Sequence, residues 1–311
     1  MKIVVTGATG HIGSYVIRDL AYKLRGSEII MIDDMRTQRY SSLYNLPSIG
    51  HYTFHDIDIT SVDIRPIIKN TDVLIHLAAI TDATGSINNA DQIEKNNYIA
   101  TQRVAESCIE TGVRVVILSS TSVYGTNKEA VSENCSPDEL QPQSPYSRIK
   151  LNEEKLINQL CMEKNLNAII CRFGTIFGAS PGMRFHTAIN KFCWQAVMGQ
   201  PITIWSTAFD QQRPYLDLID ASRAIAFIIE NDLFDGHIYN ISTLNSTVRQ
   251  VIDTIREFVP KVELAFIDNQ VMNNWSYGVS CERFKNHGFA FTGDLGRGIE
   301  ETIALLRNAN T

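Results

Sequence analysis

The first half of the chain alternates short apolar runs with stretches of helical periodicity. The apolar runs, rich in β-branched residues, cover residues 2–7, 28–33, 51–57, 72–79, 113–120 and 168–174. Helical patterns lie between them, at 11–24, 90–111 and 145–161. Strands that alternate with helices predict right-handed crossovers and a parallel sheet. Because the runs are apolar almost throughout, helices should cover both faces of the sheet, which gives a doubly wound α/β fold.

The rhythm loosens after residue 174, where a segment marked by glycine and proline, GASPGMRF, leads into a helix expected near 183–198. Short strand-like runs follow at 202–205, 213–218 and 237–242, and Asp220 is expected to cap the helix after the second of them. Such insertions usually form a second lobe over the carboxyl ends of the sheet. We predict a larger domain of residues 1–172 plus about 213–242. A smaller one comprises about 173–212 and 243–311, with a cleft between the two domains.

Composition narrows the class of protein. The 311 residues carry a formal net charge of -6 and a pI near 5.7, which argues against a nucleic-acid partner because binding phosphates needs a local excess of Lys and Arg. No run approaches the roughly 20 apolar residues that span a bilayer, and the amino-terminal run lacks a cleavage pattern, so we expect a cytoplasmic protein. The six cysteines lie far apart, without CxxC pairs, which predicts free thiols and no metal site.

Three glycines, Gly7, Gly10 and Gly13, follow the first strand and open a helix. They permit a tight turn, a close approach of backbone to a pyrophosphate, and close packing of helix on strand. Asp33 ends the next strand, where a carboxylate can accept both ribose hydroxyls of an adenosine. We therefore predict a Rossmann-type dinucleotide site. Asp33 favours NAD over NADP, although Arg36 could turn toward a 2'-phosphate and leaves NADP open.

A second group of residues suits proton transfer. Tyr146 and Lys150 lie four apart in a helical stretch, so their side chains share one face. An ammonium beside a phenol favours the phenolate, which a tyrosine needs in order to act as a base. Ser120 ends the run at 113–120, at the carboxyl end of a predicted central strand. Its hydroxyl can hydrogen-bond a substrate oxygen as charge develops on that oxygen.

These motifs, in this order and spacing, resemble one known family. TGATGHIG, Asp33, HLAA at 76–79, SSTSVYG, YSRIK and RPYLDLIDASRAI are similar to the extended short-chain dehydrogenase/reductases, chiefly the NAD-dependent nucleotide-sugar epimerases and dehydratases. The resemblance runs from residue 1 to about 305. It implies an enzyme with NAD as cofactor, a nucleotide-diphosphate sugar as substrate, and a smaller carboxyl-terminal lobe that binds this substrate.

The resemblance also implies roles for single residues. Tyr146 would be the catalytic acid/base, Lys150 its partner and ribose anchor, and Ser120 the hydroxyl-orienting residue. The implied cofactor-binding set is Gly7, Gly10, His11, Ile12, Gly13, Asp33, Asp56, Ile57, Leu77, Ala78, Ala79, Asn97, Ser119, Tyr146, Lys150 and Phe173. The implied substrate-binding set is Ser120, Ser122, Tyr146, Thr175, Asn190 and Arg213. Asp56 and Ile57 would flank the adenine, and Arg213 would clamp the substrate diphosphate.

The reaction is less closely specified. Dehydratases of this family usually carry an Asp-Glu pair directly after the hydroxyl-orienting residue, where this chain has Thr121 and Ser122, so loss of water is disfavoured. Hydride removal at carbon 4 of the sugar can then end in return to the opposite face, as in a 4-epimerase, or in release of the ketone, as in a 4-dehydrogenase or reductase. The sequence does not separate the two, and family frequency favours the epimerase. A non-catalytic NAD-binding sensor is disfavoured because Ser120, Tyr146 and Lys150 are all present.

The family also suggests the setting in which the enzyme works. Relatives dimerise through the helices that correspond to residues 90–111 and 146–163, so a homodimer in polysaccharide biosynthesis is expected by resemblance. Apolar side chains at Val104, Cys108, Leu156 and Leu160 are compatible with that interface, and equally with packing on the sheet.

Overall fold

A seven-stranded parallel sheet forms the centre of the computed structural model, which describes residues 1–81, 90–268 and 275–309. The strand order is β10-β6-β5-β4-β1-β2-β3, and each neighbouring pair is parallel. The strands are β1 (Lys2–Thr6), β2 (Glu28–Asp33), β3 (His51–Asp56), β4 (Val73–His76), β5 (Arg114–Ser120), β6 (Ala168–Phe173) and β10 (Ile238–Ile241). The reversal of strand order between β1 and β4 creates the crevice in which such sheets hold ligands.

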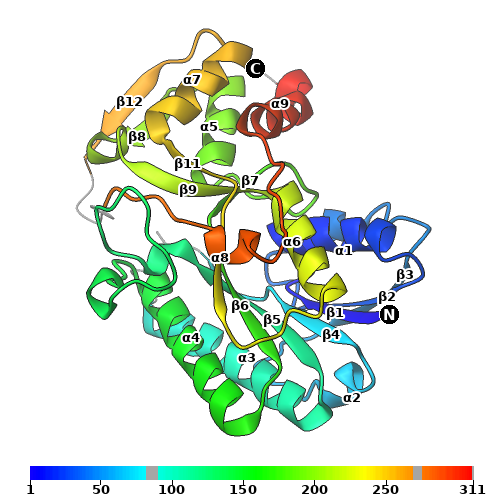
Figure 1. The fold of residues 1–311 in the computed structure, drawn as a ribbon. Coiled ribbons are helices and arrows are strands. Elements are labelled where there is room, and N and C mark those ends of the chain that lie inside the picture. The colour runs from blue at the N-terminus through cyan, green and yellow to red at the C-terminus, as the bar shows by residue number, and fades with distance from the viewer. Residues whose placement is uncertain (82–89, 269–274, 310–311) are drawn as a thin grey trace.

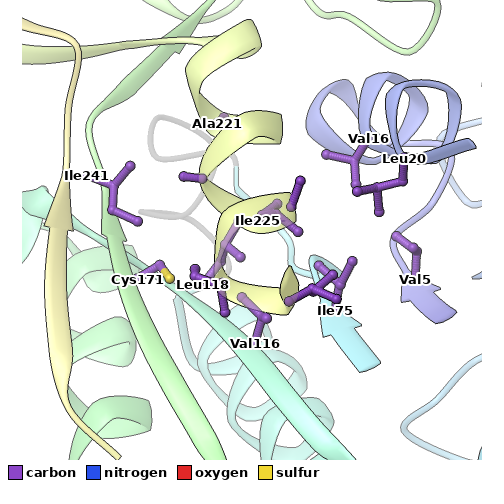
Figure 2. Close-up of a cluster of buried hydrophobic side chains, with 14 of the residues drawn as sticks. Val5, Val16, Leu20, Ile75, Val116, Leu118, Cys171, Ala221, Ile225 and Ile241 are labelled. Atoms are coloured by element: carbon purple, nitrogen blue, oxygen red, sulfur yellow. The ribbon is translucent and has the colours of Figure 1, made fainter. Parts of the chain in front are cut away.

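Helices cover both faces of this sheet (Figure 1). One face carries α1 (His11–Lys23) and α6 (Leu218–Glu230), and the other carries α2 (Arg65–Ile68), α3 (Ala90–Thr111) and α4 (Pro145–Lys164). Successive residues of a strand point to opposite faces of the sheet. Two neighbouring apolar residues therefore pack against helices on different faces. Val5 and Val116 pack toward α1 and α6 (Figure 2), whereas Val4 and Val115 belong to the core under α3 and α4. The predicted doubly wound fold is confirmed.

A smaller part of the molecule is built on two further sheets. One has the order β11-β9-β7 and the other pairs β12 with β8. The strands are β7 (Thr175–Phe177), β8 (Ile202–Trp205), β9 (Gln212–Asp217), β11 (Leu244–Thr247) and β12 (Leu264–Ile267). Its helices are α5 (Ala188–Val197), α7 (Val248–Phe258) and α9 (Leu295–Leu306), which pack around a core that includes Phe177, Ile252 and Ile299. The chain passes between the two parts several times, and the domain limits given above stay a prediction.

Short elements complete the chain. They are η1 (Tyr40–Leu43), η3 (Thr121–Val123), η4 (Pro137–Glu139), η5 (Ser206–Ala208), α8 (Glu282–Lys285) and η6 (Arg307–Ala309). All six cysteines are free. In the part of the chain that the structure describes, no helix has the length and apolar character needed to cross a membrane.

The start of α6 differs from the prediction. Asp217, rather than Asp220, is the N-cap, and its Oδ1 accepts the N–H of Ile219 at 2.9 Å. Asp220 is buried in the first turn, where its carboxylate accepts the Thr243 hydroxyl at 2.9 Å and the N–H of Gly293 at 2.8 Å. Asp220 therefore ties the segment before α9 to α6, a contact between residues too far apart in the sequence to be seen there.

The apolar residues of α3 that suited an interface have a simpler explanation. Val104 and Cys108 are buried in the core between α3 and the sheet, and Leu160 of α4 packs against the same core. Leu156 is half-buried. Val104 and Cys108 therefore stabilise the fold of one chain, and the homodimer stays a prediction that these two residues do not support.

Candidate active site

A cavity of about 810 Å³ extends from the glycine-rich turn, across the carboxyl ends of the sheet strands, to the smaller sheets. Three of the predicted site residues, Asp56, Asn97 and Asn190, do not line it. Those that do line it are Gly7, Gly10, His11, Ile12, Gly13, Asp33, Ile57, Leu77, Ala78, Ala79, Ser119, Ser120, Ser122, Tyr146, Lys150, Phe173, Thr175 and Arg213. The fold thus brings together residues from distant parts of the chain at one surface.

The glycine-rich turn has no room for side chains. Gly7 has φ +67°, and a Cβ there would stand 2.7 Å from the backbone nitrogen of Ala78. A Cβ on Gly13 would stand 2.2 Å from the carbonyl oxygen of Gly7, so the first turn of α1 lies directly against β1. The positive end of α1 therefore faces the cavity at the turn, where its free N–H groups can hold the pyrophosphate of a dinucleotide.

Asp33 is fixed at the end of β2 by backbone donors. Its Oδ2 accepts the N–H of Thr9 at 3.0 Å and its Oδ1 accepts the N–H of Met35 at 3.1 Å. The nearby Arg36 is engaged with carboxylates, since its guanidinium lies 2.5 Å from Asp34 and 3.6 Å from Asp58. With Arg36 held by two other carboxylates, Asp33 suits free ribose hydroxyls and opposes an added 2'-phosphate.

Of the two carboxylates at the carboxyl end of β3, Asp58 lines the cavity and Asp56, which was predicted to flank an adenine, does not. Asp56 is exposed at the end of β3, whereas Asp58 and Ile59 line the cavity. Burial opposes ionisation of Asp58, but the hydroxyl and N–H of Thr60, at 2.7 and 2.8 Å, and the Arg36 guanidinium outweigh it and hold its pKa below the usual value. The sequence DIDI contains the Asp-Ile dipeptide twice, at 56–57 and 58–59. Both residues of the second copy line the cavity.

Asn97 does not line the cavity but binds a backbone segment that does. Its buried amide accepts the N–H of Ile80 at 2.8 Å and donates to the carbonyl of Ile80 at 3.0 Å. This pair of bonds fixes the segment that leaves β4, in which Leu77, Ala78 and Ala79 line the cavity. Asn97 therefore positions the wall of the site rather than forming it.

The segment after β7 lies on the glycine-rich turn. The imidazole Nε2 of His11 is 2.9 Å from the carbonyl oxygen of Gly178, and burial lowers the pKa of His11 to about 4. The Ser180 hydroxyl donates to the carbonyl of His11 at 2.9 Å, and the N–H of Gly182 donates to the Ser14 hydroxyl at 2.9 Å. Ser14, Ser180 and Gly182 were not among the predicted site residues, because nothing in their local sequence shows which turn they contact.

Tyr146 and Lys150 lie on the first turns of α4, directly after the N-cap Ser144. The Lys150 ammonium is 5.9 Å from the centre of the Tyr146 ring. It donates to the carbonyl of Leu118 at 3.1 Å and to the Glu153 carboxylate at 2.8 Å. Burial raises the pKa of Tyr146, and the Lys150 charge acts in the opposite direction. Lys150 is itself buried, yet the charge of Glu153 raises its pKa above the usual value, so it carries the positive charge.

The two serines that end β5 have different surroundings. Ser120 accepts the N–H and the hydroxyl of Ser122, at 3.2 and 2.9 Å, on the cavity side. The Ser119 hydroxyl instead donates to the buried Glu154 at 2.5 Å. Ser120 and Tyr146 line the same cavity, and the orienting role of Ser120 stays a prediction.

The far end of the cavity is formed by the smaller sheets. Thr175 of β7 and Arg213 of β9 line it, and the Arg213 guanidinium lies 5.5 Å from the ring of Tyr277. Asn190 lies behind this wall, where its amide exchanges hydrogen bonds with the backbone of Gly178 at 3.3 and 3.2 Å. The next residue of α5, Lys191, points in another direction around the helix and lines the cavity instead.

Two further arginines line the cavity and were not predicted. Arg39 approaches Gly10, since a Cβ there would be 3.7 Å from its guanidinium, and Arg184 comes from the segment before α5. Burial and the Arg184 charge lower the pKa of Arg39 to about 10, which Asp33 partly opposes. Two guanidinium groups beside the glycine-rich turn suit an anionic ligand such as a pyrophosphate.

Comparison with known proteins gives the chain its relatives. The model of the NAD dependent epimerase/dehydratase family matches residues 3–242. The uncharacterized UDP-glucose epimerase YtcB of Bacillus subtilis is 31% identical over 290 residues, which cover 89% of this chain and 89% of that protein. The trifunctional UDP-glucose 4,6-dehydratase/UDP-4-keto-6-deoxy-D-glucose 3,5-epimerase/UDP-4-keto-L-rhamnose-reductase RHM2 of Arabidopsis thaliana is 29% identical over 97% of this chain. The chain spans only 46% of the length of that plant enzyme.

A solved structure resembles the whole chain. The UDP-glucuronic acid 4-epimerase from Bacillus cereus, in complex with UDP-glucuronic acid and NAD, superposes with a TM-score of 0.86 at 25% identity. The match covers 99% of this chain and 100% of that one.

Proposed function

The chain is a member of the NAD-dependent epimerase/dehydratase family, and from this premise we propose that it is a nucleotide-sugar 4-epimerase. It is an enzyme, and its cofactor is NAD. In our proposal it removes the hydride from carbon 4 and the proton from the 4-hydroxyl of a nucleotide-diphosphate sugar. It then returns the hydride to the opposite face of the resulting ketone and the proton to the ketone oxygen. The surroundings of Ser120 and Tyr146 are the observation that carries this proposal over loss of water, and family frequency ranks it ahead of a 4-dehydrogenase.

The residues around the triad of Ser120, Tyr146 and Lys150 favour reversible oxidation over loss of water. Among the described residues that line the cavity, the carboxylates are Asp33, Asp34 and Asp58, all at the adenosine end. Next to Ser120, the Thr121 hydroxyl donates to the carbonyl of Phe173 at 3.3 Å and is buried. An elimination needs an acid and a base at the carbon that loses the leaving group. A buried hydroxyl that already donates to a backbone carbonyl provides neither this acid nor this base.

We assign each step to side chains of the triad. The Tyr146 phenolate takes the proton from the sugar 4-hydroxyl, while the Lys150 ammonium stabilises the phenolate and the Ser120 hydroxyl hydrogen-bonds the same sugar oxygen. NAD held at the glycine-rich turn and Asp33 would supply the acceptor for the hydride of carbon 4 and the donor for its return. After the keto-sugar turns over within the cavity, Tyr146 returns the proton. The presence of Arg213 and Lys191 in the cavity wall near Thr175 supports binding of a diphosphate that stays in place while the sugar turns.

Cofactor and substrate are assigned to opposite halves of the cavity. Gly7, Gly10 and Gly13 would hold the pyrophosphate of NAD, with Asp33 on the adenosine ribose. The relatives whose names include UDP-glucose and UDP-glucuronic acid suggest a UDP-sugar as the first candidate substrate. A cytoplasmic homodimer that works in polysaccharide biosynthesis, with the smaller sheets as the substrate-binding lobe, is part of the same proposal.

A panel of UDP-, GDP-, CDP- and dTDP-sugars with NAD tests the proposal. The protein is incubated with each, NADH is followed by its absorbance, and the product is identified by NMR, with Tyr146→Phe as the control. An inverted sugar without net NADH is expected. Stoichiometric NADH with a keto-sugar would establish the second candidate, a 4-dehydrogenase. A 6-deoxy-4-keto product would establish a dehydratase, and NAD binding without turnover of any sugar would favour a sensor.

A further inference from the structure

A buried carboxylate accompanies the catalytic lysine. Glu153 follows Lys150 by three residues on α4, and its carboxylate lies 2.8 Å from the Lys150 nitrogen. The two side chains are only 1% and 6% exposed. A buried ion pair gains little net stability, because both charges lose their hydration. The carboxylate is therefore better explained by its effect on Lys150 than by a contribution to the stability of the fold.

Glu153 accepts one of the hydrogen bonds that the Lys150 ammonium can donate. An ammonium has three N–H donors. One donates to Glu153 and a second to the carbonyl of Leu118 at 3.1 Å, at the end of β5. Lys150 lines the cavity, so the third donor is left for the cavity side. Glu153 and Leu118 together hold the ammonium at one place beside Tyr146.

The other groups around this pair do not take the place of Glu153. On α4, Glu154 is itself paired at 2.6 Å with Arg172 of β6. On β4, His76 is neutral, because burial and then the Lys150 charge lower its pKa to about 3. On α3, the Thr101 hydroxyl lies 3.2 Å from the His76 ring and acts to lower the pKa of Glu153, which burial raises, but it carries no charge.

We propose that Glu153 is a positioning residue for the catalytic pair, whose carboxylate fixes Lys150 and offsets part of its charge at the Tyr146 phenol. This inference rests on the proposed function, since it gives Tyr146 the role of acid/base. Without the carboxylate, and with Lys150 still protonated, the full field of the ammonium reaches the phenol, and the phenolate forms at lower pH. Burial is the main cause that raises the pKa of Tyr146, Lys150 lowers it, and Glu153 contributes in the raising direction.

The test compares Glu153→Gln with the unaltered protein, both bound to NAD. Ionisation of Tyr146 is followed by the ultraviolet absorbance of tyrosinate, with the spectrum of a Tyr146→Phe variant subtracted in each background. We expect the midpoint pH of Tyr146 ionisation to be lower in Glu153→Gln by on the order of one pH unit. The acid limb of kcat/KM for the sugar substrate should move by the same amount. Glu163→Gln, which removes an exposed carboxylate from the same helix, is the control and should move neither.

Glu153→Asp keeps the charge one methylene further from the ammonium, so it should shift the midpoint in the same direction by a smaller amount. This variant carries the test if Glu153→Gln does not fold. An unchanged midpoint in a folded, NAD-binding variant would overturn the inference, as would a shift to higher pH. The titration needs no sugar, so it separates failure of this inference from failure of the proposed function. That second failure would appear as absence of turnover on every sugar.

Discussion

Gly182 lies directly against Thr9. A Cβ on Gly182 would stand 2.2 Å from the Thr9 carbonyl oxygen and 2.6 Å from that of Gly10. Both oxygens belong to the glycine-rich turn, whereas Gly182 belongs to the segment between β7 and α5. The turn that is assigned to the cofactor is therefore shaped from two sides, by its own glycines and by a glycine far along the chain.

Gly182→Ala is expected to disturb this contact. The added methyl group has to push against backbone, which cannot give way as a flexible side chain does, so overpacking should destabilise the fold by about 1–3 kcal/mol. Displacement of the turn should also weaken NAD binding by about tenfold or more, which corresponds to about 1.4 kcal/mol. Calorimetric titration with NAD and thermal unfolding measure the two effects.

Gly296→Ala serves as the control for that substitution. Gly296 lies in the first turn of α9, where a Cβ would be 3.3 Å from an Asp294 oxygen. NAD affinity should be unchanged in this variant. Equal NAD affinity in Gly182→Ala and the unaltered protein would show that the segment after β7 does not shape the cofactor site.

Asp33→Asn is expected to reduce the preference for NAD. The carboxylate can accept two ribose hydroxyls, and a hydrogen bond to a charged group contributes about 1.5–3 kcal/mol, so NAD affinity should fall by about tenfold to a hundredfold. NADP affinity should fall less or rise, since the repulsion of a 2'-phosphate is removed. The two dissociation constants are measured side by side. A parallel loss for both nucleotides would mean that Asp33 only shapes the turn through Thr9 and Met35.

The sequence predicted those parts of the fold whose signal is local. The glycine spacing, the apolar strands and the Tyr146–Lys150 pair each follow from residues close together, and their positions agree with the structure. Prediction was weaker where the same pattern occurs twice. Asp56 and Asp58 both begin an Asp-Ile dipeptide, and only the exit of the chain from β3 turns the second toward the cavity.

Long-range contacts account for the remaining differences. Asn190 was expected to face a ligand, but the backbone of Gly178 takes both ends of its amide. Val104 and Cys108 suited either an interface or the sheet, and the position of α3 over the sheet decides for the sheet. Such outcomes depend on how elements distant in the sequence pack, which no local periodicity contains.

Protonation of His76 should make stability depend on pH. Burial lowers the pKa of His76 to about 3, and the ordinary value is 6.5. Below pH 6.5 the unfolded chain therefore binds the proton more readily than the folded chain, and stability falls as the pH falls toward the folded value. At about pH 5 this effect amounts to about 2 kcal/mol. Urea unfolding near pH 7.5 and near pH 5 should give a smaller difference for His76→Asn than for the unaltered protein.

A substitution at the exposed His51 is the control for this measurement, and it should leave the pH dependence unchanged. If His76→Asn retained the full loss of stability between the two pH values, carboxyl groups elsewhere would have to account for it. The hydroxyls of Thr6 and Thr101, at 2.8 and 3.2 Å from the ring, can hydrogen-bond an amide as well as an imidazole. The variant is therefore expected to fold.

Glu154→Gln should destabilise the protein far more than an ordinary change on a helix surface. Glu154 receives two hydrogen bonds from Arg172, at 2.8 and 2.6 Å, and both side chains are 3% exposed. Removing the carboxylate charge leaves a buried guanidinium without its counter-charge, which typically costs about 3–5 kcal/mol. Tyr124, whose hydroxyl accepts from the same guanidinium at 2.8 Å, cannot replace a charge. Urea unfolding should show this loss, while Glu163→Gln on the exposed face of α4 changes the free energy of unfolding by less than about 0.5 kcal/mol. A loss below about 1 kcal/mol in Glu154→Gln would mean that water or a backbone shift solvates Arg172 once the charge is gone.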